Sequence, residues 1–302
     1  MANYQRILFF FLGLILAVPT QAITFTTGLA DTEWQLVSSP FGCLFRQNIP
    51  LYGSGVFFRE AGEDLLFYLE TDHNQMREGK AALVIEAPDW KANALTSDLG
   101  YVRVRDTHYP VVVESIRSDR MMAELLDGMA PTFTRQAIYL SDRIRVRLSP
   151  AQFKPYYEQY LACVSGLLPV NFDQIKRTNI YFDNGQDELD ASDKRLLNKI
   201  ATYILTDTRV INIYIDGHTD DRGSRYENRR LSEKRADLIQ HYLMSRNIDV
   251  GMMILNYHGE RYPVASNATA AGRAKNRRVS IRIERIMDDP DDPIAKHPNF
   301  DE

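Results

Sequence analysis

The pattern of apolar and polar positions changes once along this chain of 302 residues. From residue 23 to about residue 149, short apolar runs separated by turn residues predict β-strands, as in the two runs at 55–58 and 65–69 that flank a polar turn. A short helix is predicted at 121–126. Further strands are predicted at 82–85, 101–104, 111–113 and 143–148. We expect residues 23–168 to form a mainly antiparallel β domain, either a barrel or a sandwich.

A helix is predicted after this β-rich region, because Ser149 is a good capping residue and Pro150 suits a first helical position. The residues that follow at helical spacing are Phe153, Tyr156, Tyr157, Tyr160 and Cys163. An aromatic stripe of this kind is interpreted as core. The run 167–169 ends the helix and marks a domain boundary.

From residue 169 to residue 286, predicted strands alternate with predicted helices. Strands are expected at 180–182, 210–215, 252–257 and 279–283, and helices after Asp190 or Ser192 and from Ser224 to Met244. The order β-α-β-α-β-β predicts an α/β domain with a mixed sheet and helices on one face. Residues 287–302 are rich in Asp and Pro and predict a flexible acidic tail.

The first 22 residues are typical of a secretory signal. Arg6 precedes an apolar run at 7–18, and Thr20-Gln21-Ala22 fits a cleavage pattern. The alternative, an uncleaved anchor, conflicts with the roughly 20 apolar residues that a membrane-spanning helix needs. Cleavage after Ala22 removes Arg6 and changes the net charge from −4 to −4 − 1 = −5. This acidic balance argues against nucleic acid as a partner.

Cys43 and Cys163 are the only cysteines in the sequence. In an exported protein two thiols can form a lasting disulfide, which would close a loop of about 120 residues and stabilise the fold by roughly 4 to 5 kcal/mol. Two buried free thiols are the alternative. Neither cysteine has the spacing of a metal ligand, and no metal or other cofactor is predicted.

The candidate chemistry lies in the loop 217–223 and the helix that follows it. Asn228, Leu231 and Arg235 fall on the apolar stripe of that helix, and Asp220 precedes it on the loop. A guanidinium on an apolar face needs a partner, because an unpaired buried charge is costly. Asp220 and Arg235 either grip a ligand that carries an ammonium and a carboxylate, or form an internal salt bridge that supports the loop.

Other chemistry is less well supported by the sequence. His218 has no second metal ligand at a suitable offset, so we interpret it as a loop histidine with a local hydrogen bond. Paired carboxylates for glycoside hydrolysis could come from Asp216, Asp220, Asp221 and Glu227, but acidic loops are common. No catalytic residue is therefore predicted. Arg277 and Arg278 open the last strand and could bring further positive charge to the same site.

The second half of the chain resembles the OmpA-like peptidoglycan-binding domain. The resemblance rests on Gly217-His218-Thr219-Asp220, Gly223, Asn228, Leu231-Ser232, Arg235-Ala236 and Asn276-Arg277-Arg278-Val279. It implies that Asp220 and Arg235 hold the diaminopimelate of the peptide stem. It also implies that Asn228, Leu231, Arg277 and Arg278 line the pocket.

The first half resembles the MotY family of sodium-driven flagellar motors. The matching residues are Trp34, Cys43, Ile49 to Gly53, Pro88-Asp89-Trp90 and Cys163 before Leu167-Leu168-Pro169. This resemblance implies a non-enzymatic periplasmic protein at the flagellar basal body, associated with a MotX-like protein, that helps to hold sodium-type stator units. The alternatives are a general envelope-stability protein that binds peptidoglycan and a cell-wall hydrolase.

Overall fold

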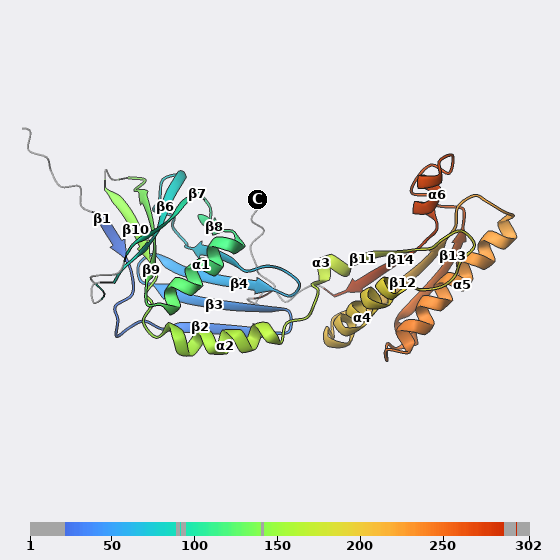
Figure 1. The fold of residues 1–302 in the computed structure, drawn as a ribbon, viewed down its shortest axis with the longest axis horizontal. Helices are drawn as coiled ribbons and strands as arrows, with labels where there is room; N and C mark the ends of the chain where they lie inside the picture. The colour runs from blue at the N-terminus through green and yellow to red at the C-terminus, as the bar shows by residue number, and fades with distance from the viewer. Residues whose placement is uncertain (1–21, 89–90, 92–94, 140–141, 287–293, 295–302) are drawn as a thin grey trace, which may run out of the picture.

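The computed structural model describes residues 22–88, 91, 95–139, 142–286 and 294, and it shows two domains side by side (Figure 1). The predicted signal, apart from Ala22, lies outside the described residues. So does the predicted acidic tail, apart from Ile294. In the part of the chain that the structure describes, we find no helix long and apolar enough to cross a membrane.

The first domain is built on one curled sheet, mainly antiparallel as predicted. Within the described residues the sheet has ten strands in the order β1-β10-β9-β6-β7-β8-β5-β4-β3-β2, and β1 pairs with β10 in parallel. The strands are β1 (Ala22–Phe25), β2 (Trp34–Ser39), β3 (Gly42–Ile49), β4 (Gly53–Glu60), β5 (Leu66–Glu70), β6 (Gly79–Glu86), β7 (Ser97–Val104), β8 (Val111–Val113), β9 (Ala130–Gln136) and β10 (Arg143–Arg147).

The expected barrel or sandwich is therefore corrected to a single open sheet. The strand order places β1 and β2 at its two edges, so over the described residues the sheet does not close into a barrel. It curls strongly, because Phe67 on β5 and Phe133 on β9 stack with ring centroids 5.5 Å apart although these strands are four positions apart in the sheet. The predicted strand pair at 55–58 and 65–69 is present as β4 and β5, which pair antiparallel. Strands β1, β2, β3 and β9 were not predicted.

Two helices cover one face of this sheet, α1 (Ser115–Leu126) and α2 (Phe153–Ser165). The aromatic stripe of α2 is part of the core, as predicted. The ring of Phe153 lies 4.8 Å from that of Trp34, and the ring of Tyr160 stacks 5.5 Å from that of Phe45. Helix α1 is longer than the predicted segment 121–126, and its buried face includes Met121 and Leu125.

The predicted start of α2 at Ser149 is wrong. The backbone of Ser149 is held by Gln47, which accepts a hydrogen bond from the Ser149 N–H at 2.8 Å and donates one to its carbonyl at 2.8 Å. These bonds keep Ser149 with the sheet. The helix begins at Phe153 instead, after Gln152, which has a left-handed backbone with φ of 59°.

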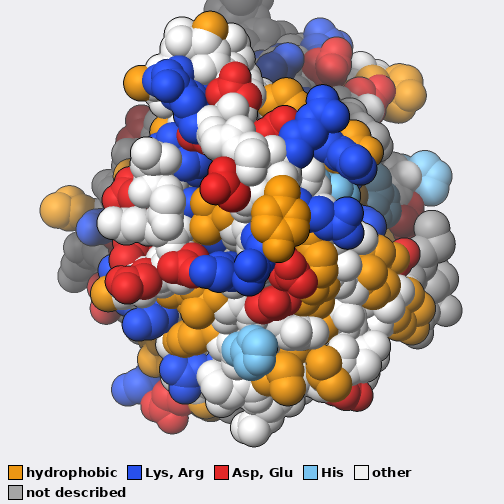
Figure 2. All heavy atoms as spheres, turned by 90° about the vertical axis from the view of Figure 1, so that its right-hand side faces the viewer, with side chains coloured by type: hydrophobic (Ala, Val, Ile, Leu, Met, Phe, Trp, Pro, Cys, Tyr) orange, Lys and Arg blue, Asp and Glu red, His pale blue; other side chains and the backbone are white. Residues whose placement is uncertain are grey.

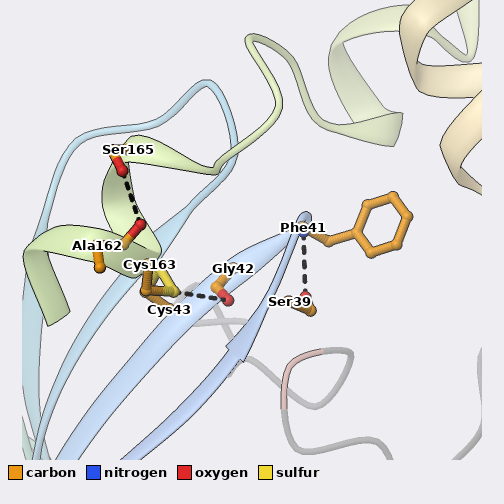
Figure 3. The surroundings of a disulfide bond; sticks show 7 residues. All are labelled: Ser39, Phe41, Gly42, Cys43, Ala162, Cys163 and Ser165. Atoms are coloured by element: carbon orange, nitrogen blue, oxygen red, sulfur yellow. Dashed lines mark hydrogen bonds between the residues drawn. A yellow bond between two sulfur atoms is a disulfide. The ribbon is translucent and has the colours of Figure 1, made fainter. Parts of the chain in front are cut away.

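The predicted disulfide between Cys43 and Cys163 is present. Their Cα atoms are 6.1 Å apart, within the usual range for a disulfide. The bond joins β3 to α2 across 120 positions of sequence (Figure 3). It therefore ties the end of the first domain to a strand near its beginning.

The second domain has a mixed sheet, as predicted, with strands in the order β11-β14-β12-β13 over residues 142–286. Strands β12 and β13 are parallel, and β14 is antiparallel to both β11 and β12. The strands are β11 (Arg177–Tyr181), β12 (Val210–His218), β13 (Met253–Gly259) and β14 (Arg278–Arg285). The helices are α3 (Phe172–Ile175), α4 (Ala191–Thr206), α5 (Arg225–Met244), a short 3-10 turn at Val250–Met252, and α6 (Ala270–Asn276).

The predicted order of elements is incomplete, because α3 and α6 were not expected. The main helices α4 and α5 pack on one face of the sheet, where Leu197 and Ile239 meet Ile213 and Ile281 in one core. The predicted caps of both helices are confirmed in detail. Asp190 accepts hydrogen bonds at the start of α4, and Ser224 does so at the start of α5.

The two domains meet at the turn between β2 and β3. In Figure 3 the side chain of Phe41 points away from the disulfide, toward the helices of the second domain. Its ring lies 5.6 Å from that of Tyr203, and the guanidinium of Arg209 lies 5.3 Å from its centre. Beside it, Gln174 donates a hydrogen bond of 2.7 Å to Glu63. The joint therefore has both an apolar and a polar contact.

Ile294 contacts the first domain. Only 7% of this residue is exposed, and it packs against buried apolar side chains on the sheet face opposite α1 and α2. Those side chains are Leu44, Val56, Phe58 and Tyr68. Within 287–302, this position therefore lies against the first domain.

Candidate functional site

The loop after β12 and the start of α5 are fixed by two local devices. In the capping box, the Ser224 hydroxyl accepts from the Glu227 N–H at 3.2 Å, and the Glu227 carboxylate accepts from the Ser224 N–H at 3.0 Å. At Gly217, a Cβ would lie 2.2 Å from the carbonyl oxygen of Ser232. The absence of a side chain there lets α5 pack directly on β12, which sets the distance between the loop and the helix.

A pocket of about 290 Å³ lies between this loop and α5. It opens at the end of the second domain that faces away from the first domain, where β11 and β12 end and α5 begins (Figure 1). Its lining residues are Asn184, Gly185, Thr219, Asp220, Arg222, Gly223, Glu227, Asn228, Leu231, Arg235 and Arg277. The structure thus brings five of the predicted site residues together: Asp220, Asn228, Leu231, Arg235 and Arg277.

Asp220 is buried, and its carboxylate has partners other than Arg235. One oxygen accepts a hydrogen bond from the Arg222 N–H at 3.1 Å, and the other pairs with the guanidinium of Arg277 at 3.1 Å. The internal Asp220–Arg235 salt bridge, one of the two interpretations of the sequence, is therefore not the arrangement found. Arg277 takes that place.

Arg235 is fully buried, with 0% of its surface exposed. Its guanidinium donates to the carbonyl oxygens of Gln186 at 2.8 Å, Asp183 at 3.0 Å and His218 at 3.5 Å, and it lies 4.9 Å from the centre of the Phe182 ring. Carbonyl groups orient the cation without neutralising it.

Burial lowers the pKa of Arg235 to about 10, and the positive charge of Arg277 adds to this effect, while Asp220 opposes it. The group therefore stays protonated at neutral pH. A guanidinium has five N–H donors, and within the described residues three of those of Arg235 have partners. Arg235 lines the pocket, and its remaining donors have no hydrogen-bond partner among the described residues.

Two further polar groups complete the pocket. The Asn228 amide donates a short hydrogen bond of 2.6 Å to Glu260, which fixes its orientation. The hydroxyl oxygen of Thr219 is buried and has no hydrogen-bond partner among the described residues. Because buried polar groups are almost always paired, Thr219 is a candidate to meet a polar atom of a ligand.

Arg278 was predicted to line the pocket, but the structure does not place it there. Arg277 caps α6 and extends to Asp220, whereas Arg278 begins β14 and contacts the Ser280 hydroxyl at 3.1 Å and the Tyr262 carbonyl at 3.4 Å. Successive side chains on a strand point to opposite faces, and a sequence pair of arginines gives no sign of which one faces the pocket.

His218 is a buried residue at the end of β12. Its ring stacks on that of His258 at 4.9 Å, and its Nδ1 has no hydrogen-bond partner within the part of the chain described. The local hydrogen bond expected for this side chain is thus not seen at Nδ1. Burial lowers the pKa of His218 to about 4, assisted by the positive charges of Arg278 and His258. In the described ranges, no group of three or more His, Cys, Asp or Glu side chains is placed to hold a metal ion.

Several pocket residues were missed by sequence reasoning. Asn184 and Gly185 come from the loop after β11, about 35 positions before Asp220 (220 − 185 = 35). The dipeptide Asn-Gly is a turn signal, but it does not show that the turn meets the α5 loop. Thr219, Arg222 and Glu227 lie within the predicted segment and were not assigned a place in the site.

Comparison with known proteins identifies both halves of the chain. Residues 25–169 match the model of the MotY N-terminal domain, and residues 181–277 match that of the OmpA family. The sodium-type flagellar protein MotY of Vibrio parahaemolyticus is 28% identical over 265 residues, which covers 85% of this chain and 89% of that protein. The chain belongs to the MotY family.

Other relatives of this MotY-family chain match its second half. Outer membrane protein A of Bordetella avium is 35% identical over 38% of this chain and 59% of its own length. Peptidoglycan-binding protein ArfA of Mycobacterium tuberculosis is 39% identical over 34% of this chain and 32% of its own length. The peptidoglycan-associated lipoprotein of Burkholderia pseudomallei, a solved structure, covers 35% of this chain and 89% of its own, with 28% identity and a TM-score of 0.34. All the pocket-lining residues lie within the OmpA-family match.

Proposed function

We propose that this MotY-family protein is a non-enzymatic, periplasmic component of the flagellar motor that binds peptidoglycan through the pocket at Asp220 and Arg235. In this proposal residues 23–168 dock to the motor, residues 169–286 bind the wall, and residues 1–22 direct export. The partners are a MotX-like protein, the basal body and sodium-type stator units. The protein helps to hold those units around the basal body.

The observation that carries the wall-binding proposal is the pairing of opposite charges in one small pocket. Asp220 presents a buried carboxylate, and Arg235 presents unused N–H donors from a site where carbonyl groups already orient it. The free end of a diaminopimelate side chain carries an ammonium and a carboxylate on one carbon. Its ammonium would meet Asp220 and its carboxylate would meet Arg235, in a charge-assisted arrangement that favours this zwitterion over a neutral side chain.

The same pocket gives little support for hydrolysis of the wall. Glycoside hydrolysis needs a carboxylic acid with a raised pKa, whereas hydrogen bonds from Ser224 lower the pKa of Glu227. Asp220 is engaged by Arg277, and Asp216 accepts from Asn256 at 2.8 Å. Three of the four carboxylates considered for catalysis, Asp216, Asp220 and Glu227, therefore have structural partners.

Binding is tested by co-sedimentation of the purified protein with peptidoglycan sacculi. We expect the wild type to sediment with sacculi. Soluble stem peptide that ends in diaminopimelate should compete with the sacculi for the protein and reduce the sedimented fraction. Stem peptide with lysine in place of diaminopimelate should compete poorly, because it lacks the second carboxylate. Equal competition by both peptides would contradict the assignment. Release of soluble muropeptides would contradict the non-enzymatic assignment.

The motor role is tested in cells by deleting the gene. Loss of swimming with an intact envelope supports a motor component. Leakage or altered cell shape with normal swimming would instead support a general envelope-stability protein. Complementation with a folded chain that carries Asp220→Asn then asks whether motility depends on the wall-binding pocket.

A further inference from the structure

A second and larger hollow lies beside the pocket. Its volume is about 580 Å³, twice that of the first, and it is formed by the first turns of α5 and the end of β13. The residues that line it are Arg225, Tyr226, Arg229, Tyr257, His258, Gly259, Glu260 and Arg261. Figure 2, which looks onto this end of the second domain, shows Lys and Arg side chains interspersed with acidic and apolar ones.

The two hollows share a wall. Asn228 lines the first and Glu260 lines the second, and the hydrogen bond of 2.6 Å between their side chains joins them. Glu227 and Tyr226, adjacent in sequence, face the first and the second hollow respectively. A ligand held in the first pocket therefore needs to cross only this side-chain bridge to enter the second.

The second hollow is positively charged in a chain that is acidic overall. Three arginines, Arg225, Arg229 and Arg261, face one carboxylate, so the local formal charge is +3 − 1 = +2, against −4 for the whole sequence. That carboxylate, on Glu260, is already engaged by Asn228 and lies 3.5 Å from Arg225. The arrangement favours an anionic ligand.

The hollow also offers an aromatic surface. Tyr226, in the first turn of α5, is 70% exposed. Aromatic rings with a polar tip suit ligands that are partly apolar and partly wet, such as sugar rings. Small-molecule sites usually measure about 300 to 1,000 Å³, and the second hollow, at about 580 Å³, falls within that range.

We propose that this second hollow binds the acidic glycopeptide portion of the same muropeptide whose diaminopimelate occupies the first pocket. Arg229 and Arg261 would meet the free carboxylate of the stem residue that precedes diaminopimelate, and Tyr226 would pack against a sugar ring. This inference rests on the proposed function, because it assumes that the first pocket holds the end of the peptide stem. It adds a contact to the glycan side of the wall that the first pocket lacks.

The test compares two ligands by isothermal titration calorimetry with the full chain. One is free diaminopimelate, and the other is the disaccharide-peptide whose stem ends in diaminopimelate. We expect the disaccharide-peptide to bind roughly tenfold more tightly than free diaminopimelate, since the stem carboxylate adds an exposed charge contact and the sugar adds a packing contact. Its advantage should shrink as salt is raised, because exposed charges are screened.

Variants separate the two hollows. The double variant Arg229→Ala/Arg261→Ala should lose most of the tighter binding of the disaccharide-peptide, with the affinity for free diaminopimelate unchanged. Arg230→Ala, an exposed arginine on the same helix that lines neither hollow, is the matched control and should bind both ligands like the wild type.

Three results would overturn the inference. Equal affinity of the wild type for both ligands would show that the second hollow adds nothing. An equal loss of affinity for both ligands in the double variant would show that the arginines act on the first pocket. Failure of the wild type to bind either ligand would contradict the proposed wall-binding function itself. The first two results contradict only the role of the second hollow.

Discussion

Replacing Asp220 by asparagine tests the wall-binding pocket with the smallest change of shape. The variant keeps an acceptor for the Arg222 N–H but removes the negative charge that meets Arg277 at 3.1 Å and, in our proposal, the ammonium of diaminopimelate. A hydrogen bond to a charged group contributes about 1.5 to 3 kcal/mol. We therefore expect the affinity for stem peptide to fall by roughly 10-fold to 150-fold.

The fold should survive this change at a moderate cost. The Arg277 side chain is 15% exposed and also donates to the Phe182 carbonyl at 3.0 Å, so it keeps a partner when Asp220 loses its charge. We expect the free energy of unfolding to fall by about 1 to 3 kcal/mol. Chemical denaturation measures this loss of stability. The binding calorimetry is then run under conditions in which the variant is folded.

Asp221→Asn is the matched control, because Asp221 is the neighbouring carboxylate, is exposed and does not line the pocket. It removes the same charge from the same loop. Wild-type affinity in Asp220→Asn, or equal losses in the two variants, would refute the assignment of Asp220 to the ligand ammonium.

Three further predictions concern the fold. The double variant Cys43→Ser/Cys163→Ser should lose about 2 to 5 kcal/mol of stability in denaturant titrations, and an unchanged midpoint would show that the bond does not constrain the unfolded chain. For His218, the unfolded state binds more protons than the native state between pH 6.5 and about 4. The free energy of unfolding should therefore fall as pH falls through that window, by about 3 kcal/mol at most, and His218→Gln should flatten this dependence of stability on pH. Phe41→Ala should leave both domains folded but broaden the distribution of interdomain distances between spin labels, whereas an unchanged distribution would show that Phe41 does not fix the joint.

The sequence was most informative where a feature depends on neighbouring residues. The capping box of Ser224 and Glu227 involves positions three apart, and the structure confirms it. The aromatic stripe from Phe153 to Tyr160 has helical spacing, and the structure confirms it as core. The disulfide was predicted because the chain has only two cysteines and was expected to be exported.

Features that depend on distant segments were harder to predict. Gln47 holds Ser149 in place from 102 positions away, and this bond moves the start of α2 despite a favourable capping sequence. Strand β9 contains Pro131, which lowers its apparent strand character although it pairs with both β6 and β10. The partner of Asp220 was also uncertain, because Arg235 and Arg277 each reach this end of the sheet.

The structure adds a geometric argument to the proposed motor function. The pocket lies at the end of the second domain that faces away from the first, and β14 runs back from Arg277 beside the pocket toward the joint (Figure 1). Force applied to a ligand bound at Asp220 would be transmitted to β12 and β14, which are joined by an antiparallel ladder of hydrogen bonds.

At the joint, that load would meet Phe41 in the turn before β3, two positions from Cys43 (43 − 41 = 2). The disulfide connects β3, directly after this turn, to α2, the helix that leads into the second domain, so the strand and that helix are held together covalently. In a protein that holds stator units against the wall, such a joint would limit the stretch between motor and wall. The disulfide therefore stabilises the domain and also supports the contact through which the proposed load would pass.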